Sequence, residues 1–123
     1  MENNTKLATL ITSWELKRFG KTISKEEYVK YYNIPLDDSM SVMYIRGDVR
    51  LTKNMGDYNS VTYSSSVSLP VSFNITNPES EENFGRFEHG CRLRDYMLKH
   101  DLAEVKAIVI EEWIKEKNKS IKK

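Results

Sequence analysis

The sequence has few of the residues that build covalent or metal-based scaffolds. Its single cysteine, Cys91, excludes an internal disulfide and a cluster of thiolate ligands for zinc. The two histidines, His89 and His100, stand outside an HExxH motif, so we expect no metal site. The five glycines form neither a P-loop nor a GxGxxG motif, and we expect no cofactor.

Long apolar runs are also missing. No stretch approaches the roughly 20 apolar residues that a membrane helix needs. The N-terminal segment has neither the basic start nor the cleavage site of a secretory signal. With 30% charged residues and a net charge of +1, the composition is that of an ordinary globular protein. We therefore expect a cytoplasmic protein with a single domain, 1–123.

Charge of one sign gathers only at the C-terminal end. Segment 115–123, KEKNKSIKK, contains five lysines and one glutamate. We expect a basic, frayed helix end, where lysines interact favourably with the helix dipole; contact with nucleic acid is the alternative. The many lysine, asparagine and isoleucine residues are typical of an AT-rich genome, such as that of a low-GC bacterium or its phage.

Helical spacing of apolar residues predicts two N-terminal helices. Segment 4–20 places Leu10 and Trp14 four positions apart, and Gly20 is suited to end a helix there. Segment 23–35 begins with Ser24 and Glu27, which fit a capping box.

From residue 40 the pattern changes to the period of two that is typical of strands. Apolar and polar residues alternate without a break over 61–75, where the polar positions are mostly serine. A turn at Gly47 would create a hairpin before this segment. Segment 61–75 contains no charge and includes Pro70, which predicts that its second half is an edge strand.

Two further helices are predicted at the C-terminal end. Asn77 and Pro78 fit the start of one helix, and Asp101 with Glu104 fits the capping box of another. The expected fold is therefore α+β. It has a central antiparallel sheet of about four strands within 40–75, flanked by two N-terminal and two C-terminal helices.

The segment FGRFEHGCRLRDY, 84–96, holds the chemically most versatile residues. On a helix, Arg86 and Arg94 would lie on either side of Gly90, and an anion could approach the backbone between two guanidinium groups. The predicted ligand-binding residues are Arg86, Phe87, His89, Gly90, Arg92 and Arg94. The alternative is that these arginines pair with neighbouring acids and that the glycines permit close packing.

No catalytic group can be assembled from these residues. On a helix, His89 and Cys91 would point in different directions and could not act as a base and a nucleophile. We therefore expect a protein without enzymatic activity.

An uncharged edge strand needs a cover, which predicts a homodimer or larger oligomer. The predicted interface residues are Val67, Leu69, Val71, Phe73 and Trp113.

These expectations favour a non-catalytic oligomeric protein that sequesters or senses an anionic, nucleotide-like small ligand. One alternative is a protein-interaction module, such as a phage-encoded inhibitor of a host defence protein. Another is a regulatory or accessory factor that binds nucleic acid through the basic tail and Arg46 or Arg50. A helix-turn-helix over 23–47 would serve this last role, although Asp37 and Asp38 at the start of its second helix would repel phosphate.

Overall fold

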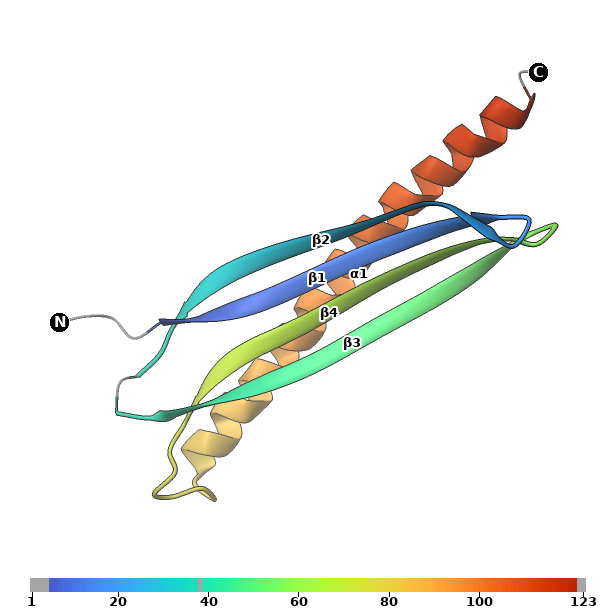
Figure 1. The fold of residues 1–123 in the computed structure, drawn as a ribbon. Helices are drawn as coiled ribbons and strands as arrows, with labels where there is room; N and C mark the ends of the chain where they lie inside the picture. The colour runs from blue at the N-terminus through green and yellow to red at the C-terminus, as the bar shows by residue number, and fades with distance from the viewer. Residues whose placement is uncertain (1–4, 38, 122–123) are drawn as a thin grey trace.

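The computed structural model describes residues 5–37 and 39–121 as a four-stranded antiparallel sheet with one long helix across one face (Figure 1). The elements in chain order are β1 (Thr5–Arg18), β2 (Lys21–Pro35), β3 (Ser41–Gly56), β4 (Asn59–Phe73) and α1 (Glu81–Ile121). The strand order is β2-β1-β4-β3, so two hairpins meet through their inner strands. The α+β class and the antiparallel sheet are confirmed.

The two predicted N-terminal helices are wrong, because both segments are strands. Leu10 and Trp14 lie four residues apart, and this spacing suits one face of a strand as well as one face of a helix. Ala8 and Leu16 are even-numbered like Leu10 and Trp14, so all four lie on the same face of β1. Their side chains are buried on the face that α1 covers. Gly20 does not end a helix. With a φ of 79° it forms the hairpin turn between β1 and β2.

Only two of the four strands lie within 40–75, where the sequence predicts all of them. Gly47 does not turn the chain but lies inside β3, paired with Val67. A side chain at this position would crowd α1, because its Cβ would lie 3.0 Å from Arg94 Cδ and 3.1 Å from Leu98 Cδ1 and these side chains would have to move aside. Gly47 therefore allows α1 to pack closely on β3 and does not form a turn.

The alternating pattern is confirmed as a strand over 61–73, within β4, and β4 lies between β1 and β3 as far as Ser68; beyond Ser68 it pairs with β3 alone, so the end of its second half does lie at an edge. β4 pairs with β1 over Ser60–Ser68 and with β3 over Asn59–Phe73. Pro70 lies beyond the last pair with β1. The edges are formed by β2 and β3, which carry the charges that protect an edge. The absence of charge in β4 therefore reflects its place inside the sheet.

The two predicted C-terminal helices form one continuous helix of 41 residues, α1. It begins at Glu81 rather than at Pro78, because Ser80 is the cap: its Oγ accepts a hydrogen bond of 3.2 Å from the backbone N–H of Asn83. Asp101 does not start a new helix but is buried within α1. Among the described residues, no helix has the length and apolar character needed to cross a membrane.

The C-terminal basic segment continues this helix as far as Ile121. Lys115 Nζ lies 3.4 Å from a carboxylate oxygen of Glu112, and Lys119 Nζ lies 3.2 Å from one of Glu116. The last two lysines of the predicted tail, 122–123, are outside the described residues.

The core consists of two clusters of buried side chains under α1. The first contains Ala8, Leu10, Ile45, Val67, Leu69, Val71 and Leu98, and the second contains Trp14, Leu16, Val61, Tyr63, Val105, Val109 and Trp113. Ser65 of β4 is also fully buried on this face. Four of the predicted interface residues belong to these clusters, and Phe73 is half-buried. Their apolar pattern is therefore accounted for within one chain, while the oligomer stays a prediction.

Close contact between α1 and the sheet depends on Gly90. A Cβ at this position would lie 2.7 Å from Ile45 Cδ1 and 2.8 Å from Val71 Cγ2, whereas a Cβ at Gly85 would have nothing within 4 Å. We expect Gly90→Ala to lower the free energy of unfolding by about 1–3 kcal/mol because it overpacks this contact. Gly85→Ala, the matched control, should raise it by up to about 1 kcal/mol through helix propensity.

Urea unfolding followed by circular dichroism measures both changes. Equal effects of the two substitutions would contradict the close approach of Gly90 to the sheet.

Candidate functional site

One face of the sheet is left open by the fold. Since the odd-numbered residues of β4 face α1, the even-numbered ones project from the opposite face. Within residues 5–37 and 39–121, no helix or strand covers that face, which we call the open face (Figure 1). The hydroxyl residues that β4 contributes to it are Ser60, Thr62, Ser64, Ser66, Ser68 and Ser72.

Strand register places charged residues beside this row of hydroxyls. In β3, Arg46 pairs with Ser68, Asp48 with Ser66 and Arg50 with Ser64. In β1, Thr9 is the partner of Ser68. Arg46 and Arg50 are four residues apart in one strand, which corresponds to about 13 Å.

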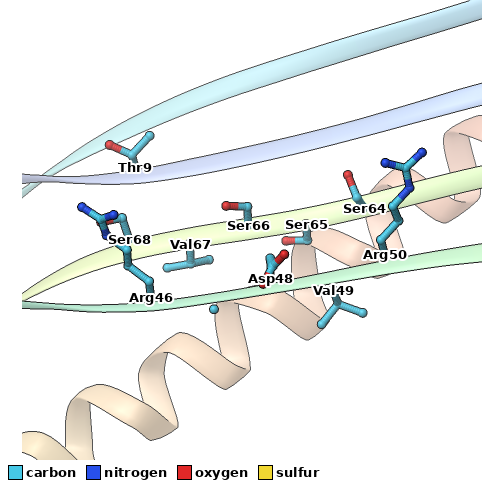
Figure 2. A pocket seen from close by; sticks show the side chains of 11 residues that line it. Thr9, Arg46, Asp48, Val49, Arg50, Ser64, Ser65, Ser66, Val67 and Ser68 are labelled. Atoms are coloured by element: carbon cyan, nitrogen blue, oxygen red, sulfur yellow. The ribbon is translucent and has the colours of Figure 1, made fainter.

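These side chains line a hollow of about 700 Å³ on the open face, shown in Figure 2. Its polar lining comes from Thr9, Arg46, Asp48, Arg50, Ser64, Ser66 and Ser68. A second hollow of about 400 Å³ shares Arg50 and extends toward Glu15 and Lys25. Where the two meet, the hydroxyls of Ser13 and Ser64 are hydrogen-bonded at 2.5 Å.

The six arginines of the chain differ in their partners. Four of them, Arg18, Arg86, Arg92 and Arg94, hydrogen-bond through their guanidinium groups. Arg46 and Arg50 have neither a hydrogen bond nor an ion pair from the guanidinium group in the described part of the chain. The two guanidinium groups that line the larger hollow therefore keep their donors available for a ligand.

The arginines predicted as a ligand site on α1 do not converge. Arg94 lies against β3, where Nη1 donates to the backbone carbonyl of Arg46 at 3.3 Å and Nε donates to Asp95 at 3.1 Å. Arg92 is exposed and forms a 2.9 Å ion pair with Glu88 one helical turn away. The space over Gly90 is filled by the sheet. Ion pairing along the helix, the alternative interpretation, accounts for the contacts of Arg92 with Glu88 and of Arg94 with Asp95.

Arg86, His89 and Gly90 do line a separate, smaller hollow of about 240 Å³ between the start of α1 and the end of β4. Arg86 Nη2 donates to Asn83 Oδ1 at 3.0 Å, and the group is 4.0 Å from Glu82. Phe87 is exposed and lines a different hollow. Of the six predicted ligand-binding residues, Arg86, His89 and Gly90 therefore share one hollow, and for these three together a ligand site stays a prediction.

An acidic group lies close to Arg86. Asp37 accepts hydrogen bonds from the Ser39 hydroxyl at 2.6 Å and from the Ser39 backbone N–H at 2.9 Å. These bonds lower the pKa of Asp37, and the positive charge of Arg86 acts in the same direction. The field of Arg86 is therefore partly compensated by this carboxylate.

From the sequence alone, Arg46 and Arg50 are expected to bind a ligand only in the nucleic-acid alternative. The sequence does show that Arg46, Asp48 and Arg50 are alternate residues, which share one face of a strand. This spacing indicates a site only once β3 is known to pair with β4, because the pairing places these three residues beside the serines of β4.

Comparisons of the chain with known protein families, with curated proteins and with solved structures each found no match. The candidate site is therefore defined by its own geometry.

Two neighbouring arginines of α1 allow a test of these assignments. We expect Arg94→Ala to lower the free energy of unfolding by about 1–2 kcal/mol, because it removes hydrogen bonds and the packing of the side-chain stem over Gly47. Arg92→Ala removes only an exposed ion pair and should cost at most about 0.5 kcal/mol. Chemical denaturation gives both values, and a larger loss for Arg92→Ala would contradict the placement of Arg94.

Proposed function

We propose that this protein is a non-catalytic binding protein that holds a phosphate-bearing, nucleotide-like ligand on the open face of its sheet. The observation that carries the proposal is the pair of guanidinium groups, Arg46 and Arg50, which have no partner among the described residues and line the hollow of about 700 Å³.

The lining matches the chemistry of a phosphate group. A guanidinium group donates two parallel hydrogen bonds to phosphate oxygens, and such charge-assisted bonds are stronger than neutral ones. Serine and threonine hydroxyls donate to the same oxygens. The hollow offers Ser64, Ser66 and Ser68 between β1 and the two arginines.

Asp48 and Tyr31 favour a nucleotide over a bare phosphate ion. Asp48 lies between the two arginines in β3 and can accept hydrogen bonds only from a ligand with donors, such as ribose hydroxyls. Tyr31 pairs with Thr9 in the register and thus shares a row with Ser68 and Arg46. Tyr31 is 62% exposed, so a base could stack on its ring.

The same lining supports binding rather than catalysis. Among the described residues that surround the hollow there is neither histidine nor cysteine, and Asp48 is the one carboxylate. A nucleophile with an adjacent base cannot be formed from this set.

A second candidate function is a protein-interaction module, as the inhibitor hypothesis requires. Leu7, Val29 and Tyr31 are 44–62% exposed at the β2 side of the open face. Exposed apolar and aromatic residues of this kind are suited to a protein partner. This candidate does not require the arginines.

Fluorescence anisotropy at low salt tests the first proposal, with a fluorescent ATP derivative and a labelled thymidine oligonucleotide as the two probes. We expect Arg46→Gln and Arg50→Gln each to weaken binding by about tenfold, because each removes charge-assisted hydrogen bonds. Arg92→Gln removes the same charge from the exposed side of α1 and should change the affinity by less than about twofold.

The variants also separate the alternatives. Loss of binding in Arg86→Gln, with Arg46→Gln and Arg50→Gln unaffected, would contradict the open-face site and favour the hollow at the start of α1. Binding of the oligonucleotide alone would favour the nucleic-acid alternative. Absence of binding to either probe would leave the interaction module as the better proposal.

A further inference from the structure

Three potential metal ligands converge on the other face of the sheet, in the middle of α1. His100 Nδ1 lies 3.5 Å from Asp101 Oδ1 and 3.8 Å from Glu104 Oε1. One ligand atom from each residue lies within 4.8 Å of the others. Ligands at about 2.0–2.2 Å from a tetrahedral zinc ion are about 3.3–3.6 Å apart, so small side-chain rotations would close this group around one ion.

The burial of Asp101 is a second observation, independent of the distances, that favours a cation beside this side chain. Its side chain is 8% exposed, and Oδ2 is buried without a hydrogen-bond partner among the described residues. A buried carboxylate oxygen that lacks a partner is destabilising, because it loses its interaction with water. A metal ion bound by both carboxylate oxygens of Asp101 would replace that interaction for Oδ2.

Neighbouring side chains hold the other two ligands in place. Glu104 directs Oε2 toward Lys30 Nζ of β2, at 3.6 Å, and this leaves Oε1 on the side of His100. The ring of Tyr96 stacks on His100 with a centroid distance of 6.0 Å. Such contacts around the ligands orient them for an ion.

The group is accessible to an ion from solvent. The side chains of His100 and Glu104 are 56% and 52% exposed. On the inner side, Asp101 and Glu104 border a hollow of about 220 Å³ that also includes Thr12 and Tyr28. Three protein ligands would leave one position of the ion open toward water or toward a small ligand in this hollow.

We propose that His100, Asp101 and Glu104 bind one divalent transition-metal ion of the zinc class. The imidazole favours zinc over magnesium or calcium, which prefer sites made of oxygen ligands alone. The sequence predicts no metal site, because these residues match no spacing motif. Their significance comes from the burial of Asp101 and from Lys30, which belongs to a distant part of the chain.

Isothermal titration calorimetry of the tag-free chain with Zn²⁺ tests the proposal. We expect one saturable site per chain. His100→Ala and Asp101→Asn should each weaken binding by at least about tenfold, because the first removes a ligand and the second removes the negative charge of a ligand. The matched control is His89→Ala, which removes the other histidine and should change the affinity by less than about twofold.

A thermal-unfolding measurement provides a second readout. Because an ion that binds only the folded state stabilises it, Zn²⁺ should raise the Tm of the unaltered chain and of His89→Ala, but not that of Asp101→Asn. Asparagine preserves the size of the side chain, so circular dichroism can establish that this variant is folded.

The proposal is overturned if the unaltered chain shows no saturable binding up to about 100 µM Zn²⁺. It is also overturned if His89→Ala weakens binding as much as His100→Ala. Either outcome leaves the nucleotide proposal untouched, because Arg46 and Arg50 lie on the opposite face of the sheet.

Discussion

The packing of α1 against the odd-numbered face of β4 is the contact on which the rest of the structure depends. It buries both apolar clusters and thereby determines which face of the sheet remains open. Two glycines allow this contact: Gly90 brings the helix backbone onto Ile45 and Val71, and Gly47 makes room for Arg94 and Leu98. Because the side chains of a strand alternate, burying one set of β4 residues presents the serines on the other side.

The sequence predicted the parts of this structure that depend on local pattern. The alternation in β4 continues over many residues and fits only a strand. The N-terminal segments were mistaken for helices because the spacing of Leu10 and Trp14 suits both periods, and because the capping pattern of Ser24 and Glu27 also occurs in strands. The pairing of β1 with β2 and β4 determines that these segments are strands and not helices, and no local sequence pattern carries that information.

The candidate sites were harder to predict because each joins distant segments. The arginines of 86–94 are close together in sequence, yet the side chain of Arg94 contacts β3, whereas Arg86 lines a hollow at the end of β4. Conversely, Arg46 and Arg50 gain a row of hydroxyls from a strand that follows them in the chain. The candidate site on the open face therefore depends on strand register rather than on a short motif.

The strand order also has a consequence for how the chain folds. Each hairpin joins neighbouring segments through a short turn, but the ladder between β1 and β4 joins residues such as Ser13 and Ser64, which are 51 positions apart. Closing so large a loop has an entropic cost that the hairpins do not bear. We therefore expect the hairpins to form early and the docking of β1 on β4 to limit the folding rate, as is usual for contacts between distant segments.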